Sequence, residues 1–92
     1  MSEPAAAEVV LYTRPGCHLC EVVKAQLERL RDAVVFSYRE VNIDADPALR
    51  DEFSDQVPVV FINFINGRKA FKYRLDEKAF LKRIRSTARR SV

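Results

Sequence analysis

The chain contains the stretch Tyr12-Thr13-Arg14-Pro15-Gly16-Cys17-His18-Leu19-Cys20, which holds both of its cysteines. A short apolar run, residues 9–12, leads into this stretch and predicts a β-strand. Residues 18–31 carry apolar side chains at helical spacing and predict a helix. Pro15 and Gly16 mark the turn between the two elements. The stretch therefore predicts a strand, a tight turn and a helix that begins at the cysteines.

The two cysteines occupy different positions on this helix. Cys17 lies at or just before its first residue, where the positive end of the helix dipole and the unpaired N–H groups favour a thiolate. We therefore expect the pKa of Cys17 to lie below that of a free thiol. Cys20 lies one turn later, on the side of Val23 and Leu27, and should be less exposed. The alternative is a pair of buried cysteines that only pack.

Composition predicts one small globular domain. The 92 residues are 48% hydrophobic and 32% charged, which is ordinary for a soluble domain. Two cysteines cannot form a secreted disulfide framework, whereas C-x-x-C beside a strand–helix unit is typical of a redox motif in a reducing compartment. We expect a cytoplasmic protein with a disordered tail at residues 1–7, a domain at residues 8–88 and a basic tail at residues 89–92, without signal peptide or membrane span.

The net charge is +3 and the pI is about 9.1. A solvated helix end explains the basic residues near the C-terminus, because cations suit the negative end of the helix dipole. A patch for nucleic acid or an acidic partner is the alternative, but no nucleic-acid motif accompanies the charges. We expect a monomer that binds neither nucleic acid nor membrane. The basic residues concerned are Lys82, Arg83, Arg85, Arg89 and Arg90.

The middle of the chain continues the alternation of strands and helices. Residues 34–43 begin as an apolar run, then alternate, and predict a second strand. Strand, helix and strand over about thirty-five residues predict a crossover between parallel strands. Asp46 suits the N-cap and Pro47 the first position of a short helix, residues 47–53.

The second half predicts a hairpin. Residues 57–62 form an apolar run in which Pro58 is tolerated at the start of the strand. Asn66-Gly67 is typical of a type I′ turn between antiparallel strands. That turn predicts four cross-strand pairs: Ile62 with Phe71, Val60 with Tyr73, Val59 with Arg74, and Phe61 with Lys72.

A last helix completes the predicted fold, with Asp76 as its N-cap and a buried stripe at Phe80, Leu81, Ile84 and Ala88. The whole is an α/β fold in the order βαβαββα. It has a four-stranded mixed sheet, with strands in the spatial order 2-1-3-4, flanked by three helices.

Two segments resemble those of the glutaredoxins, a family within the thioredoxin fold. Residues 10–20 are similar to the family's active-site segment, in which a strand ending in Tyr-Ser/Thr-Lys precedes C-x-x-C at a helix start. Residues 57–62 resemble its Val-Pro segment, whose proline is cis and lies against the redox cysteines. The element order is similar from about residue 8 to residue 88, which implies a thioredoxin-like, or glutaredoxin-like, fold.

The sequence also departs from the familiar glutaredoxins. His18-Leu19 stands where they carry Pro-Tyr, and Gln56 stands where they carry Thr. Residues 71–76 hold no glycine where the family has a Gly-Gly pair that lets the γ-glutamyl end of glutathione approach the backbone. Phe71 and Lys72 are expected to crowd glutathione there. The chain is most similar to the small glutaredoxin-like proteins, here with a C-H-L-C active site.

The resemblance implies a thiol–disulfide oxidoreductase in cell redox homeostasis. It would use no bound cofactor beyond a redox-active Cys17–Cys20 disulfide, with Cys17 as the nucleophile and Cys20 as the resolving thiol. Its partners would be protein or small-molecule disulfides and a thiol reductant or reductase. Glutathione would be a weak ligand at best.

Five more residues are candidates for substrate binding or for tuning the thiols. His18 is a general acid, a cation beside Cys17, or a solvent-facing side chain. Arg14 pairs with the thiolate or a substrate carboxylate, as the matching Lys does in glutaredoxins, or is a surface cation. Val57 offers a backbone edge, and Pro58, if cis, shapes the wall that receives a substrate. Asp76 begins the last helix, whose N–H groups suit a carboxylate unless Asp76 itself occupies them.

Two other functional classes stay open at this point. A metal or iron–sulfur carrier would use the same thiolates, and heavy-metal-binding domains also place C-x-x-C at a helix start, but in the order βαββαβ. Tetrahedral zinc needs four ligands, and the chain offers two cysteines and one histidine, so we expect no metal site within one chain. The third class is a non-catalytic interaction module that kept the fold.

Overall fold

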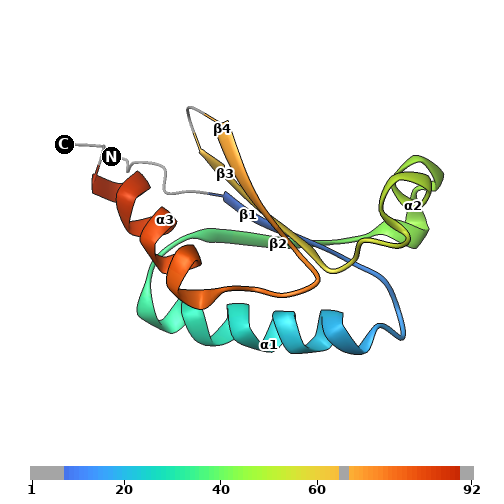
Figure 1. The fold of residues 1–92 in the computed structure, drawn as a ribbon, viewed down its shortest axis with the longest axis horizontal. Helices are drawn as coiled ribbons and strands as arrows, with labels where there is room; N and C mark the ends of the chain where they lie inside the picture. Colours follow the sequence, from blue (N-terminus) through green and yellow to red (C-terminus); the bar gives the residue numbers. More distant parts are fainter. Residues whose placement is uncertain (1–7, 65–66, 90–92) are drawn as a thin grey trace.

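The computed structural model describes residues 8–64 and 67–89, with side chains at residues 8–63 and 70–85. The predicted order of elements is confirmed (Figure 1). The elements are β1 (Glu8–Thr13), α1 (His18–Ala33), β2 (Ser37–Asn42), the short 3₁₀ helix η1 (Ile43–Ala45), α2 (Pro47–Phe53), β3 (Val59–Phe64), β4 (Gly67–Lys72) and α3 (Glu77–Arg89).

The four strands form one mixed sheet in the order β2-β1-β3-β4, as predicted. β1 and β2 are parallel, because α1 carries the chain back across the sheet between them. β3 is antiparallel to both β1 and β4. The ends of β1 and β2 and the start of β3 therefore meet at one edge of the sheet, where α1 also begins (Figure 1).

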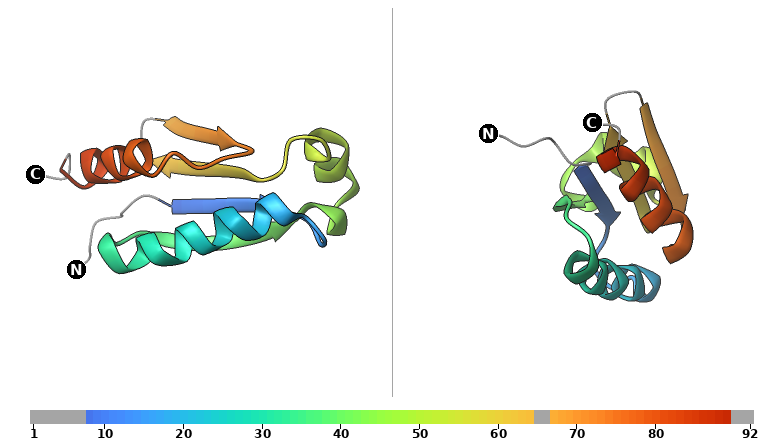
Figure 2. Two further views of the ribbon diagram at one scale, coloured as in Figure 1. Left: turned by 60° about the horizontal axis from the view of Figure 1, so that its bottom comes forward. Right: turned by 90° about the vertical axis from the view of Figure 1, so that its left-hand side faces the viewer.

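Each face of the sheet carries its own apolar cluster. On one face, Val9 and Leu11 of β1 pack with α1 and α3, which both cover this face (Figure 2). On the other face, Val59 and Phe61 of β3 pack with Phe53 of α2. Alternate residues of β1 and β3 serve opposite faces, because side chains alternate along a strand. β3 is buried on both faces for this reason, which explains its continuous apolar run.

Two predicted caps fix where the shorter and the last helix begin. Asp46 Oδ1 accepts the N–H of Ala48 at 3.0 Å, and α2 spans the predicted residues from Pro47 to Phe53. Asp76 Oδ1 accepts the N–H of Ala79 at 3.1 Å at the start of α3. Each bond satisfies an N–H group that has no partner within its helix.

Gln26, a polar residue of α1, joins α1 to α3. Gln26 Nε2 donates to Glu77 Oε2 at 2.8 Å and contacts the Leu75 C=O at 3.4 Å. Arg29 also bonds to Glu77, at 3.2 Å. Gln26 thus holds the first turn of α3 against α1. Phe80 and Ile84 of the predicted stripe are buried, Leu81 is half-buried, and the side chain of Ala88 lies outside the described residues.

The second strand is shorter than predicted. β2 begins at Ser37, so the apolar residues 34–36 precede it. Phe36 is buried against the ring of Phe80 at a centroid distance of 5.3 Å, whereas Val35 is 84% exposed. Phe36 and, in part, Val34 thus pack on the α1–α3 core from a connecting segment, so their hydrophobicity does not indicate strand conformation.

The predicted hairpin register is wrong by two residues. Val60 pairs with Phe71 and Phe64 with Gly67, instead of Ile62 with Phe71. Gly67 is the first residue of β4, and the predicted turn residue Asn66 lies outside the described residues. A shift of two keeps every side chain on its predicted face, so alternation alone cannot distinguish the two registers.

Among the described residues, no helix has the length and apolar character needed to cross a membrane. The predicted tail at residues 1–7 lies outside the described residues, as do residues 90–92 of the predicted basic tail, while α3 continues to Arg89.

Candidate active site around the cysteine pair

The turn between β1 and α1 depends on one glycine. Gly16 has φ of 78°, a left-handed conformation that favours glycine. A Cβ there would meet no atom within 4 Å, so the requirement is one of backbone conformation and not of space. The turn reverses the chain so that Cys17 is presented at the start of α1.

Cys17 is the N-cap of α1. Its Sγ accepts the backbone N–H of Cys20 at 3.1 Å, and its C=O accepts the N–H of Glu21 at 3.2 Å. The sulfur therefore occupies the position at which a helix N-terminus receives an electron-rich atom. The predicted placement of Cys17 at the helix start is confirmed.

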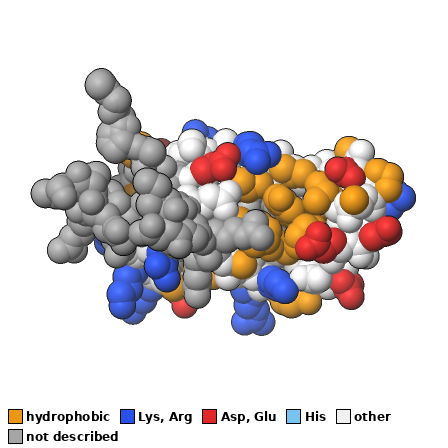
Figure 3. Space-filling view, turned by 90° about the horizontal axis from the view of Figure 1, so that it is seen from above, with side chains coloured by type: hydrophobic (Ala, Val, Ile, Leu, Met, Phe, Trp, Pro, Cys, Tyr) orange, Lys and Arg blue, Asp and Glu red, His pale blue; other side chains and the backbone are white. Residues whose placement is uncertain are grey.

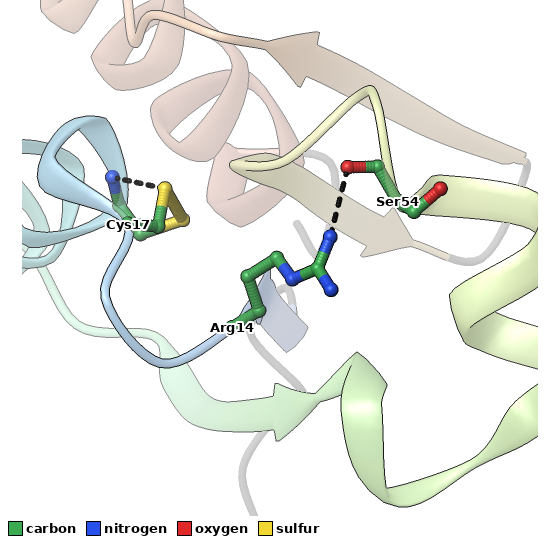
Figure 4. The surroundings of a disulfide bond; sticks show 4 residues. Arg14, Cys17 and Ser54 are labelled. Atoms are coloured by element: carbon green, nitrogen blue, oxygen red, sulfur yellow. Dashed lines mark hydrogen bonds between the residues drawn. A yellow bond between two sulfur atoms is a disulfide. The ribbon is translucent and has the colours of Figure 1, made fainter.

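Cys17 and Cys20 form a disulfide, with Cα atoms 5.2 Å apart (Figure 4). Cys20 is only 1% exposed and lies among core residues, whereas Cys17 is half-buried. The predicted difference in exposure is confirmed. Of the two cysteines, Cys17 is therefore the one more open to solvent.

Arg14 is engaged away from the disulfide. Its Nη1 donates to the C=O of Ser54 at 3.2 Å (Figure 4). Its Nη2 lies 3.0 Å from Asp44 Oδ1. The Asp44 contact is an ion pair without hydrogen-bond geometry, and that oxygen has no aligned donor among the described residues. Arg14 thereby joins the end of β1 to η1 and to the C-cap of α2. Its predicted interaction with a thiolate or a substrate carboxylate stays a prediction.

The Val57–Pro58 peptide bond is cis, as predicted. Pro58 is fully buried, and Val59 pairs with Tyr12, so the proline lies level with the end of β1 and the turn that leads to Cys17. Val57 is half-buried. Neither its N–H nor its C=O has a hydrogen-bond partner within residues 8–64 and 67–89. An open stretch of backbone therefore lies at this edge of the sheet.

The remaining predicted residues take separate positions. His18 is the first residue of α1 and is exposed. Asp76 occupies an N-terminal donor of α3 with its own carboxylate. Phe71, which was expected to crowd glutathione, instead points into the core, where its ring lies 6.5 Å from that of Phe80. Lys72 is exposed.

Sequence reasoning missed Tyr73 as a residue of this site. Its N–H donates to the C=O of Pro58 at 2.8 Å, and its hydroxyl donates to the C=O of Asp55 at 3.2 Å. Its φ is 70°, unusual for a residue with a side chain. The predicted register placed Tyr73 within the last strand, opposite Val60, whereas it actually lies beyond the end of β4 and beside Pro58. Only the correct register reveals this neighbour.

The surface opposite α1 is apolar near this site. Figure 3 shows apolar side chains gathered beside α2, with acidic and basic side chains around them. Tyr12, Leu49 and Val57 pack there partly exposed against Phe53 and Phe61. No group of three or more potential metal ligands lies within the described residues. The arrangement as a whole places one disulfide next to an open backbone edge and an apolar surface.

Comparisons with known proteins agree with this architecture. A family model described as "Glutaredoxin-like domain (DUF836)" matches residues 8–85. The uncharacterized protein Rv0508 of Mycobacterium tuberculosis is 35% identical over 82 residues, which cover 84% of this chain and 78% of that protein. The solution structure of protein Ne2328 from Nitrosomonas europaea is 32% identical with a TM-score of 0.71, over 91% of this chain and 98% of that chain.

A more distant structure confirms the predicted thioredoxin-like fold. The oxidized form of mitochondrial thioredoxin 3 from Saccharomyces cerevisiae matches with a TM-score of 0.67 over 89% of this chain and 79% of that chain. At 15% identity, this likeness shows the fold alone.

Proposed function

Because this chain belongs to the glutaredoxin-like (DUF836) family, we propose that it is a thiol–disulfide oxidoreductase that uses Cys17 as its nucleophile and Cys20 as its resolving thiol. The observation that carries the proposal is the placement of the disulfide. Cys17 caps a helix and is only half-buried, whereas its partner Cys20 is buried one turn away. A disulfide that only stabilises the fold does not require one sulfur at a helix N-terminus beside an open backbone edge, whereas a reactive thiolate benefits from that position.

In the reduced protein, the Cys17 thiolate attacks one sulfur of a substrate disulfide. The substrate S–S bond breaks, its other sulfur leaves as a thiolate that takes up a proton, and a mixed disulfide joins Cys17 to the substrate. The Cys20 thiol loses its proton and its sulfur attacks Cys17 Sγ. This releases the second substrate thiol and leaves the Cys17–Cys20 disulfide. Two electrons pass to the substrate, and a thiol reductant or a reductase then returns the protein to the dithiol.

The helix start supports the first step. The Cys20 N–H that bonds to Cys17 Sγ lies in the first turn of α1, where a negative sulfur is stabilised more than a neutral thiol. The burial of Cys20 supports the second step, because a buried thiol is protected from external disulfides and reacts with the sulfur held beside it.

The test compares Cys17→Ser with Cys20→Ser. Cys17→Ser should lose disulfide reduction completely, because Ser is no nucleophile towards sulfur. Cys20→Ser should accumulate a mixed disulfide with a substrate, seen as added mass on the intact protein under non-reducing conditions. Val35→Ser serves as the control, since Val35 is exposed beyond the far end of α1, about 24 Å of helix from Cys17.

Two results would overturn the proposal. One is a native protein whose Cys17–Cys20 pair cannot be cycled between dithiol and disulfide in a redox buffer. The other is purified reduced protein that carries stoichiometric metal or an iron–sulfur cluster, which would favour a carrier function for the same thiolates.

A further inference from the structure

Tyr73 has a backbone conformation that a residue with a side chain rarely adopts, at φ of 70°. It directly follows Lys72, the last residue of β4, and turns the chain towards α3. A residue held in this conformation needs compensating contacts, and sites of this kind gather near functional segments. Its two hydrogen bonds are those contacts.

The two bonds fix the path of the Tyr73 side chain. Its main-chain N–H reaches the C=O of Pro58, and its hydroxyl reaches the C=O of Asp55. The side chain therefore spans the segment between these two carbonyls and runs alongside residues 56 and 57. With 47% of its surface exposed, it presents a fixed aromatic ring to solvent on that flank.

The segment beneath this ring carries the open backbone edge. The N–H and C=O of Val57 have no partner within the described residues, and Val57 stands next to Pro58 at the level where β1 runs into the Cys17 turn. Unpaired backbone of this kind can bind an extended peptide segment by main-chain hydrogen bonds, while flanking side chains select what accompanies it.

Exposed apolar side chains concentrate at this end of the molecule. Among the described residues, four large apolar side chains are exposed, and three of them belong to this end: Leu19 between the cysteines, Val22 one turn later, and Tyr73. The fourth, Val35, lies beyond the other end of α1. Meanwhile the Arg14 charge is engaged by Asp44, and Asp76 holds a donor of α3. Two groups that would otherwise attract carboxylates are thus occupied.

Building on the proposed function, we propose that Tyr73 determines the substrate class of this site. Its ring forms an apolar wall beside the Val57 backbone. The wall favours a cysteine within an extended polypeptide segment that carries an apolar side chain next to it. The same ring disfavours glutathione, whose γ-glutamyl and glycine ends are charged and cannot replace the water they lose against an aromatic ring.

The test measures kcat/KM for two probes, insulin and a glutathionylated peptide, with dithiothreitol as reductant and its background rate subtracted. Tyr73→Gly removes the ring and suits the left-handed backbone. It should lower kcat/KM for insulin about tenfold and raise it for the glutathionylated peptide. Tyr73→Phe keeps the ring and should leave the ratio of the two values within about threefold of native. Val35→Ser removes an exposed apolar side chain at the other end of α1 and should change neither value.

Two further measurements separate specificity from damage. The Cys17–Cys20 midpoint potential should stay unchanged in Tyr73→Gly, because the disulfide is not altered. If that variant does not fold, Tyr73→Asn replaces it, since Asn also tolerates this conformation. A folded, active variant with an unchanged substrate ratio overturns the inference. Failure of the native protein to reduce either probe contradicts the proposed function itself, and this inference then falls with it.

Discussion

On one face of the sheet, α1 and α3, with 16 and 13 residues, close a core in which aliphatic side chains predominate. On the other face, a seven-residue helix covers a smaller cluster around Tyr12, Phe53 and Phe61. These three rings meet edge to face, with Tyr12 and Phe53 centroids 4.9 Å apart. Residues 54–58 follow directly after Phe53 of this second cluster. They include Ser54, whose C=O accepts from Arg14, and the cis proline Pro58.

The difference indicates that one face mainly stabilises the fold and the other mainly positions the candidate site. The α1–α3 core contributes most of the buried apolar surface and so most of the stability. The aromatic cluster is smaller, but it fixes the segment that forms one side of the candidate site. Mutations on the first face should therefore change the free energy of unfolding, and mutations on the second should also change exchange with substrates.

The largest expected effect is that of Phe80→Ala. Phe80 is fully buried and contacts the rings of Phe36 and Phe71. Its loss should reduce the free energy of unfolding by about 4 kcal/mol, because a cavity remains in a core that cannot collapse fully. Urea denaturation gives this value. The molecules that stay folded should keep the native rate of insulin reduction. A lower rate per folded molecule would contradict the assignment of this face to stability alone.

Compared with Phe80→Ala, Phe53→Ala should lower the free energy of unfolding less and the insulin reduction activity more. Phe53 is 7% exposed at the end of a short helix, so the expected loss is about 3 kcal/mol, the low end for a buried Phe. The loop that follows should also become less ordered and raise KM for insulin. Phe53→Leu keeps apolar volume and is the matched control. Equal losses of activity in Phe80→Ala and Phe53→Ala, per folded molecule, would remove the distinction.

The two helix caps sharpen the comparison. Asp76→Ala and Asp46→Ala each remove one carboxylate that accepts a backbone N–H, so each should cost about 1 kcal/mol. Asp76→Ala should leave exchange with insulin unchanged, because it acts on the α1–α3 face. Asp46→Ala frays the short α2 and should raise KM. Chemical denaturation and steady-state rates of both variants decide whether the site depends on α2.

Asp44→Asn should have the smallest effect on stability. The Arg14–Asp44 pair is about one-third exposed on each side, and pairs of this kind contribute at most about 1 kcal/mol. The substitution keeps the shape of the side chain and the Arg14–Ser54 bond. Asp51→Asn, on an exposed position of α2, is the control for lost charge. A loss well above that of the control would mean that Arg14 is a structural clamp and more than a surface cation.

Much of the fold follows from local signals in the sequence. Asp46 with Pro47 located the start of α2, and Pro15-Gly16 before Cys17 located the start of α1, because caps and turns act within a few residues. The order of strands followed from the handedness of the crossover and the presence of a hairpin.

The wrong predictions concern the hairpin register, the start of β2 and the position of Tyr73, none of which local sequence signals determine. Asn66-Gly67 favoured one hairpin register, but β3 pairs with β1 from Tyr12 to Glu8 and extends to Phe64, which pairs with Gly67. Phe36 looked like part of a strand because it is apolar, and it packs from a connection instead. Tyr73 was not predicted as a site residue for two reasons. Its position depends on the hairpin register, and a tyrosine in the sequence gives no sign of a positive φ.

Thiol labelling of the reduced protein tests the central claim most directly. Iodoacetamide is applied across a range of pH, and the rate of modification at each cysteine is followed by peptide mass analysis. Cys17 should be modified first, with an apparent pKa below that of a free thiol, because its sulfur caps α1 and is accessible while Cys20 is 1% exposed. Faster labelling of Cys20, or a Cys17 that titrates like a free thiol, would contradict the assignment of Cys17 as the nucleophile.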